Sequence, residues 1–133
     1  MSDFDAPVLK YAPVLVVNSS AAGAIELALR LHTHGCPADI AISCRAARAA
    51  ARAKHYRSVI VVGNPHRAPD LDCLASLRSA LPATWIIVID THAMPGEGGT
   101  TASYYADAVI AKSFSLDDLL RRLTAFSHRP RPP

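Results

Sequence analysis

Two histidines and an aspartate stand near the ends of predicted strands and offer the donor atoms of a metal site. His66 follows one apolar run, and Asp90 and His92 lie at and just beyond the end of the next. Two imidazole nitrogens and a carboxylate oxygen are common ligands of transition metals. Their spacing matches no zinc motif, however, and most loop histidines are simply exposed to solvent. We therefore expect these residues to bind no metal.

The glycine-rich segment PGEGGTT, residues 95–101, has a composition that suits phosphate binding. Glycines ahead of a helix let backbone N–H groups approach an anion. The segment fits neither the Walker A pattern nor the dinucleotide-binding pattern, because the lysine and the correctly spaced third glycine are missing. The serines form no GxSxG turn either. We therefore expect a protein that is not an enzyme and carries no cofactor, with a loop over this segment.

The composition is that of one globular domain. The chain has 133 residues, of which 50% are hydrophobic and 19% charged, which is enough to bury a core and too few for two ordinary domains. A net charge of +3 gives little support for nucleic-acid binding. Arg45, Arg48 and Arg52 fall on one face of a predicted helix, where we expect them to be solvated.

The N-terminus and the hydropathy pattern argue against export and membrane insertion. The first residues, MSDFDAPVLK, lack the basic-then-apolar order of a signal peptide. No apolar run approaches the roughly 20 residues that span a bilayer. We therefore expect a cytoplasmic protein.

The three cysteines form no recognisable pattern. Cys36, Cys44 and Cys73 are odd in number and irregular in spacing, and no CxxC pair is present. Neither a disulfide framework nor a zinc site is indicated by such spacing. We expect small buried thiols.

Short apolar runs alternate with helix-like segments along the chain. Strands are predicted over residues 13–17, 38–43, 58–63, 84–90 and 106–112, and helices over 21–35, 45–56, 70–81, about 101–105, and 115–126. Ser19 or Ser20 is the expected cap of the first helix, and Ser115 that of the last. Strict alternation predicts a three-layer α/β domain with a parallel sheet, and continuous apolar strands predict that both sheet faces are covered. Outside the domain, residues 13–126, we expect an N-terminal extension over 1–12 and a disordered, basic, proline-rich tail over 127–133.

A stretch near the end of the chain carries the clearest resemblance to a known family. The stretch ADAVIAKSFSLDDLLRRL is similar to the end of the receiver domain of two-component response regulators, where a strand and a lysine lead into Lys-Pro-Phe and a final helix. Lys112 and Phe114 match that motif, and Ser113 replaces its proline. The resemblance extends over about residues 13–126. It implies a flavodoxin-like doubly wound sheet of five parallel strands in the order 2-1-3-4-5.

The same resemblance implies a phosphorylation site at the carboxyl ends of the strands. In the family, two acids after strand 1 and an acceptor aspartate after strand 3 hold magnesium, while a hydroxyl and a lysine stabilise the phosphoryl group. In this sequence the corresponding positions are Asn18, Ser19, Gly63, Asp90 with Thr91 beyond it, and Lys112. Only the lysine is retained, so the resemblance implies an atypical or pseudo-receiver without ordinary aspartyl phosphorylation. We expect Asp90 and Lys112 to form an ion pair in the vacated pocket; phosphorylation of Asp90 itself is the alternative.

The functional prediction is a receiver-like signalling domain of a bacterial two-component or phosphorelay system that acts through protein–protein contact. No output domain follows residue 126, so we expect an adaptor or competitor whose partner is a histidine kinase, a phosphotransfer protein or another regulator. The other option is a homodimer formed through the predicted fourth helix, fifth strand and last helix. The expected interaction face comprises Tyr104, Tyr105, Val109, Phe114, Arg121 and Arg122, with Val109 at the position where the family has an aromatic switch residue. A different reading of the same strand ends is a site for a small anion that uses Ser19, Ser20, Lys112 and the glycine loop.

Overall fold

A computed structural model describes residues 13–92, 105–127 and 131–132. Its strands are β1 (Val14–Asn18), β2 (Ala38–Ala41), β3 (Ser58–Gly63), β4 (Trp85–Asp90) and β5 (Ala108–Ala111). Its helices are α1 (Ala21–Thr33), α2 (Cys44–Ala53), α3 (Ala68–Ala80) and α4 (Leu116–Ser127). The short helix expected over 101–105 and the extension over 1–12 fall outside the described residues, except for Tyr105, which lies in a turn.

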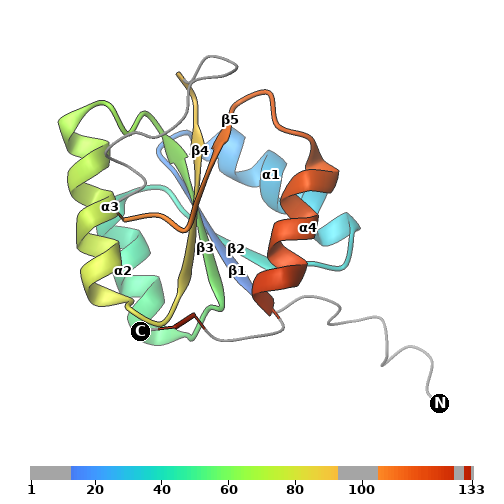
Figure 1. The fold of residues 1–133 in the computed structure, drawn as a ribbon, viewed down its shortest axis with the longest axis horizontal. Coiled ribbons are helices and arrows are strands. Elements are labelled where there is room, and N and C mark those ends of the chain that lie inside the picture. Colours follow the sequence, from blue (N-terminus) through green and yellow to red (C-terminus); the bar gives the residue numbers. More distant parts are fainter. Residues whose placement is uncertain (1–12, 93–104, 128–130, 133) are drawn as a thin grey trace.

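The five strands form one parallel sheet in the order β2-β1-β3-β4-β5, which confirms the predicted order. Helices α1 and α4 cover one face of the sheet, and α2 and α3 cover the other (Figure 1). The register pairs Asn18 with Val62 and Gly63 with Asp90. The carboxyl ends of the three central strands therefore meet at one edge of the sheet.

Side chains of the strands alternate between two hydrophobic cores. In β3, Ile60 is buried in the core under α1 and α4, whereas Val59 and Val61 are buried in the core under α2 and α3. Both faces are covered, as the continuous apolar runs predicted. Full burial of one such side chain contributes about 1.5–3 kcal/mol, so these cores fix the strands that carry the edge residues.

The helices begin where side chains or proline satisfy their first N–H groups. Ser20 is the cap of α1 and accepts a hydrogen bond of 3.2 Å from the N–H of Gly23. Ser115 accepts one of 3.3 Å from the N–H of Asp118 at the start of α4. Helix α3 begins two residues earlier than predicted, at Ala68, and carries proline in its first turn, where the missing N–H costs no hydrogen bond.

At the opposite edge of the sheet, where β4 begins, two stacked aromatic rings join β4 to α4. The rings of Trp85 and Phe126 lie parallel, with centroids 4.1 Å apart and planes 5° from each other. Trp85 is the first residue of β4 and is buried. This contact anchors the end of α4 to the sheet.

An ion-pair cluster also ties the C-terminal tail to this edge. Asp107 accepts hydrogen bonds from Arg78 Nη1 at 3.2 Å, Arg131 Nε at 2.8 Å and the N–H of Ile86 at 2.8 Å. Arg131 Nη1 also donates to the carbonyl of Pro82 at 3.0 Å. Arg131 therefore contacts the domain through a half-buried carboxylate, whereas the disorder expected over residues 127–133 stays a prediction. Within the described ranges, no helix combines the length and hydropathy needed to cross a membrane.

Candidate functional site

The carboxylate of Asp70 occupies the space beside Gly63, the residue expected at the acceptor position. A Cβ atom placed on Gly63 would lie 3.0 Å from Asp70 Oδ2 and 3.2 Å from its Cγ. Asp70 lies in the first turn of α3, and its Oδ2 accepts a hydrogen bond of 2.8 Å from the N–H of Asn64. The position is therefore filled by a carboxylate from the next helix. Sequence reasoning missed this residue, because only the close approach of the α3 turn to the strand end reveals it.

Asp90 is a buried carboxylate that pairs with a histidine. Its residue is 0% exposed, its Oδ2 lies 3.2 Å from Nε2 of His66, and its Oδ1 accepts a hydrogen bond of 2.9 Å from the N–H of His92. The expected ion pair between Asp90 and Lys112 was wrong, since Lys112 forms no ion pair with any described residue. Lys112 instead lines a pocket next to Thr91. The two charged groups thus belong to different parts of the edge.

The histidines do not converge on a metal site in the part of the chain that the structure describes. The ring of His66 contacts Asp90, whereas Nδ1 of His92 lies 2.9 Å from Oγ1 of Thr91. No group of three or more histidine, cysteine, aspartate or glutamate side chains that could hold a metal ion is found among these residues. The donors therefore satisfy protein partners.

The larger pocket at the strand ends has a volume of about 440 Å³ and lies between α1 and the β5–α4 connection. Polar lining comes from Asn18, Ser20, Glu26, Arg30, Thr91 and Lys112, and the apolar lining from Leu27, Val62, Ile89 and Phe114. Asn18 Oδ1 accepts a hydrogen bond of 3.0 Å from the N–H of Ser20. Its amide also explains Gly23, because a Cβ there would lie 2.7 Å from Asn18 Nδ2. Asn18 therefore shapes the β1–α1 turn and one wall of this pocket.

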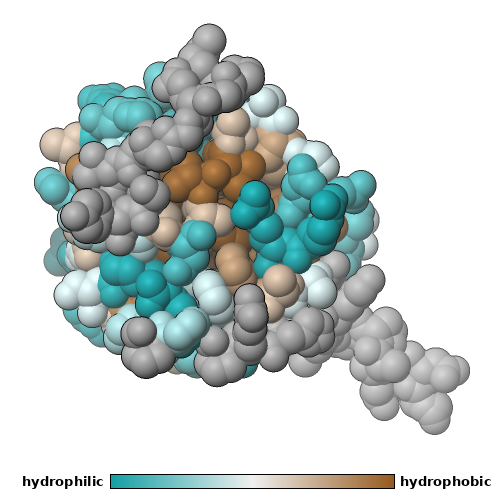
Figure 2. All heavy atoms as spheres, in the orientation of Figure 1, coloured by the Kyte–Doolittle hydropathy of each residue, from teal (hydrophilic) through white to brown (hydrophobic). Residues whose placement is uncertain are grey.

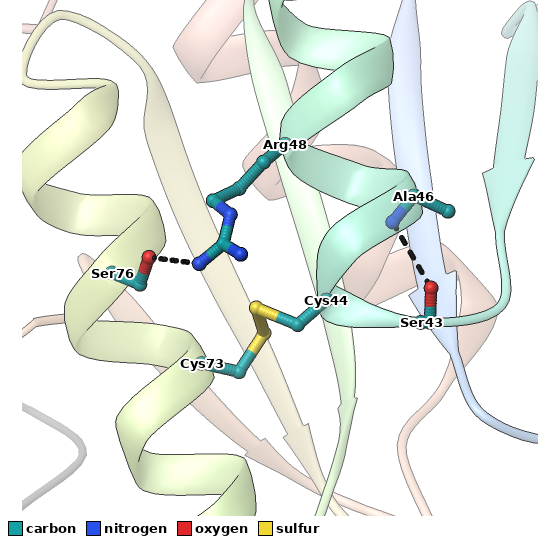
Figure 3. The surroundings of a disulfide bond; sticks show 6 residues. All are labelled: Ser43, Cys44, Ala46, Arg48, Cys73 and Ser76. Carbon is teal, nitrogen blue, oxygen red and sulfur yellow. Dashed lines mark hydrogen bonds between the residues drawn. A yellow bond between two sulfur atoms is a disulfide. The ribbon is translucent and has the colours of Figure 1, made fainter.

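A smaller pocket, of about 220 Å³, opens on the other side of Asn18. Its lining includes Ser19, Asp70, Cys44 and Cys73. The two cysteines form a disulfide between α2 and α3, with their Cα atoms 5.7 Å apart (Figure 3). The expectation of three free thiols was wrong for this pair, because sequence spacing does not show that α2 and α3 are neighbours. Cys36 is the free, buried cysteine, and burial raises the pKa of its thiol to about 11.

The six residues expected at the degenerate phosphorylation site therefore meet at one sheet edge but in separate surroundings. Thr91 and Lys112 line the larger pocket, Ser19 lines the smaller one, and Asn18 borders both. Gly63 is covered by Asp70. Asp90 is sealed under His66. Magnesium prefers one or two carboxylates together with phosphate oxygens. Asn18 and Ser19 supply none, and the carboxylates of Asp70 and Asp90 near Gly63 already bond to the N–H of Asn64, to His66 and to the N–H of His92.

The residues expected to form an interaction face lie around the edge strand β5. Tyr105 and Val109 pack against the core under α2 and α3, and Phe114 packs against the core under α1 and α4. Arg121 and Arg122 are exposed on α4, and Arg121 Nη2 donates a hydrogen bond of 2.8 Å to Asp118. Tyr104 falls outside the described residues. The interface itself stays a prediction.

One arginine of α2 departs from the solvated stripe that the sequence suggested. Arg45 and Arg52 are exposed, but Arg48 is half-buried and donates a hydrogen bond of 2.8 Å to Oγ of Ser76 on α3. Figure 3 shows its side chain directed from α2 toward α3, near the disulfide. Arg48 is thus a second link between these helices, which helical spacing alone could not distinguish from a solvent contact.

Comparisons with known proteins agree on the fold. No protein-family model and no curated protein matches the sequence. Solved structures of response-regulator receiver domains do match. A receiver domain of a Francisella response regulator has a TM-score of 0.75 at 18% identity, over 89% of this chain and 98% of that chain. A CheY-like receiver domain from Methylobacillus flagellatus has a TM-score of 0.72 at 22% identity, over 87% and 98%.

A third structure, response regulator TrrA from Thermotoga maritima in complex with Mg²⁺ and BeF, has a TM-score of 0.71 at 22% identity, over 86% of this chain and 98% of that chain. All three neighbours are similar in fold over nearly their whole length. The chain therefore has the CheY-like, flavodoxin-like receiver fold, as the sequence resemblance implied.

Proposed function

We propose that this chain is a receiver-like signalling domain of a two-component system that acts by protein–protein contact, not as an enzyme, and without ordinary aspartyl phosphorylation. The observation that carries the proposal is the filled acceptor position. Gly63 supplies no carboxylate, and Asp70 occupies the adjoining space with its own hydrogen bond to the backbone. A phosphoryl group needs an accessible nucleophile and a counter-ion, and neither Asn18 nor Ser19 supplies a charge for magnesium.

The surface around β5 and α4 supports a role in protein contact. Figure 2 shows hydrophobic residues over β5 near the middle of this face, beside hydrophilic residues over α4. Val109 and Ile110 are partly exposed on β5, which is the last strand of the sheet order, and Arg121 and Arg122 are exposed on α4. An apolar strip with arginines at its rim is the composition of many interfaces. We propose this surface as the contact site for a histidine kinase, a phosphotransfer protein or another regulator, or for a second copy of the chain.

A cytoplasmic location is part of the proposal. Disulfides are rare in that compartment and are usually transient there. In a cytoplasmic protein, the Cys44–Cys73 bond would therefore belong to this rare and usually transient class.

Incubation with a small phosphodonor and magnesium, followed by intact mass measurement, tests the loss of phosphorylation. We expect no added phosphate in the wild type. Asp70→Asn and Asp90→Asn serve as matched variants, because each removes one carboxylate near Gly63 at almost constant volume. A phosphate that appears in the wild type and disappears in either variant would overturn the proposal.

The contact surface is tested by titrating the chain against phosphotransfer domains of histidine kinases from the same genome. Arg121→Glu and Arg122→Glu, combined in one variant, should weaken binding at least about tenfold by reversing charge at the rim. Arg45→Glu, an exposed arginine on α2, is the matched control and should bind as the wild type does. Equal affinity of all three proteins, or no binding partner in the panel, contradicts this surface.

The larger pocket favours a second candidate, binding of a small anion. Its volume of about 440 Å³ falls in the range of ligand sites. Arg30 and Lys112 bring positive charge to its lining, and neither forms an ion pair within the described residues. Thermal unfolding with phosphate, nucleotides and acyl-phosphate mimics distinguishes the candidates. A shift that is lost in Lys112→Ala favours ligand binding, whereas no shift with any of them favours the adaptor.

A further inference from the structure

We propose that the Cys44–Cys73 disulfide is a site of reversible thiol–disulfide exchange that controls the smaller pocket at the vacated acceptor position. The proposal deepens the function proposed above, because it names a regulatory input for the same sheet edge. Its physical basis is the position of the bond. Both cysteines line the pocket of about 220 Å³ together with Asn18 and Ser19, the residues at the lost metal positions.

The two cysteines of the disulfide are accessible to solvent, whereas the third cysteine is not. Cys44 and Cys73 are partly exposed and face a pocket, whereas Cys36 is 0% exposed in the core. A thiol in solution can therefore approach the disulfide through the pocket. Exposure of this kind distinguishes exchangeable disulfides from those sealed in a core.

Helix α2 has few other contacts that hold it against α3. Its ten residues are mostly alanines, and Ala47 is its fully buried residue. Small side chains bury little apolar area, so they contribute little packing free energy. Besides the disulfide, the two helices are linked by the hydrogen bond from Arg48 to Ser76 and by the shared core in which Ala47 lies with Leu74. Breaking the disulfide should therefore loosen α2 while the sheet stays intact.

The disulfide is one helical turn away from the carboxylate beside Gly63. Asp70 and Cys73 are three residues apart on α3, so they share a helix face, and both line the smaller pocket. The disulfide thus holds the turn that presents Asp70. Loss of the bond frees this turn to move, and with it the carboxylate that fills the acceptor position.

The surroundings of the two sulfurs give the exchange a direction. Cys44 is the first residue of α2, directly after the cap Ser43, and the first turn of the helix contains no acidic residue. Arg48 lies one turn further on the same side (Figure 3). A helix N-terminus and a nearby cation both favour a thiolate. Cys44 is therefore the better leaving group, and the incoming thiolate attacks Sγ of Cys73.

The reductant is a dithiol, either a small molecule or a protein with a reactive cysteine pair. One thiolate of the dithiol bonds to Sγ of Cys73 as the S–S bond breaks, and the electron pair leaves with Cys44. The second thiol of the dithiol, as its thiolate, then displaces Cys73 from the mixed disulfide. Two electrons and two protons pass in total, so the chain becomes a dithiol and the reductant a disulfide. The oxidised dithiol reverses the reaction.

The test follows the purified full chain through buffers of reduced and oxidised glutathione, in which two glutathione molecules take the roles of the two thiols of the dithiol and leave as oxidised glutathione. Alkylation with intact mass is the readout of thiols, and hydrogen–deuterium exchange is the readout of structure. We expect two cysteines to become alkylated, and circular dichroism to show a folded chain throughout. Exchange in α2 and in residues 63–70 should rise at least about tenfold on reduction, with α4 unchanged. Cys44→Ser combined with Cys73→Ser should show the reduced pattern in every buffer, and Cys36→Ala should behave as the wild type does. Glutathione in a mixed disulfide should map to Cys73.

Three results would overturn the proposal. Cysteines that react only after denaturant is added would show an inaccessible bond. Unfolding of the whole chain on reduction would show a purely structural bond, and equal exchange in both states would show no coupling to the pocket. The wild-type experiment decides these outcomes even if the serine variants fail to fold. Since no partner and no phosphodonor is present, a negative result leaves the proposed adaptor function intact.

Discussion

Substitution of Gly63 should destabilise the chain because Asp70 already occupies the adjoining space. In Gly63→Ala the new Cβ would lie 3.0 Å from Asp70 Oδ2, below the 3.4 Å at which ordinary contact begins. The carboxylate must then move by a few tenths of an ångström, which lengthens its 2.8 Å hydrogen bond from the N–H of Asn64. The backbone itself poses no obstacle, since the positive-φ glycine among the described residues is Gly35.

The magnitude follows from two opposing contributions. A hydrogen bond to a charged group contributes about 1.5–3 kcal/mol, and its partial loss should cost about 1–2 kcal/mol. Removing a glycine from the unfolded chain returns about 0.4–1 kcal/mol. We therefore expect Gly63→Ala to lower the free energy of unfolding by about 1 kcal/mol. Gly63→Asp should cost about 2–3 kcal/mol more than Gly63→Asn, because two carboxylates about 4 Å apart repel by about 4 kcal/mol at an effective dielectric constant of about 20.

Urea unfolding at neutral pH measures these changes in a double-mutant cycle with Asp70→Ala. In the Asp70→Ala background, Gly63→Ala should be neutral or stabilising by about 0.5 kcal/mol, because the obstructing carboxylate is gone. The coupling free energy between the two sites should thus be about 1–2 kcal/mol. If Gly63→Ala has the same effect with and without the Asp70 carboxylate, the contact carries no energy and the account of a filled acceptor position fails.

Three other perturbations probe the packing and charge of the fold. Replacing both cysteines of the disulfide with serine should lower the free energy of unfolding by about 3.5 kcal/mol, from the loop entropy of a 29-residue separation, as measured by urea unfolding. Asp107→Ala should cost about 2–4 kcal/mol in the same assay, because it leaves the half-buried guanidinium of Arg78 without its carboxylate, whereas Arg131→Ala should cost under about 1 kcal/mol. Burial, and then the hydrogen bond to Asp39, raise the pKa of Tyr56 from 10.0 to about 12. The stability that the protonated Tyr56 contributes is therefore complete below pH 10 and is lost as the pH rises toward 12. The free energy of unfolding, measured from pH 10 to 12, should decline less in Tyr56→Phe than in the wild type.

The architecture was predictable because local signals agree with one another. The uninterrupted run Val59–Val62 can be satisfied only by a strand buried on both faces, and Ser20 supplies a cap where the next helix must begin. Alternation of strands and helices then requires a parallel sheet. The strand order came from the family resemblance, since spacing carries no information on which strands are neighbours.

The interior of the site was less predictable because it depends on contacts across elements. Asp70 and Gly63 are seven residues apart in sequence, but their contact depends on how tightly α3 follows β3. Asp90 pairs with His66 and not with Lys112 because of the side of the sheet on which each side chain lies. These are distances of a few ångströms between elements, which residue type and periodicity do not encode.

The stacked rings of Trp85 and Phe126 allow the end of the sheet where β4 begins to be observed separately from the end that carries the pockets. Trp85 is the single tryptophan of the sequence, and it lies at the opposite end of β4 from Asp90, about 16 Å away at the rise of a strand. Its emission should therefore report how α4 sits on the sheet through the ring of Phe126. Ligands or reductants at the pockets should leave that fluorescence unchanged. A change in emission in such an experiment would show that ligand binding or reduction at the pockets also alters the packing of α4 on the sheet.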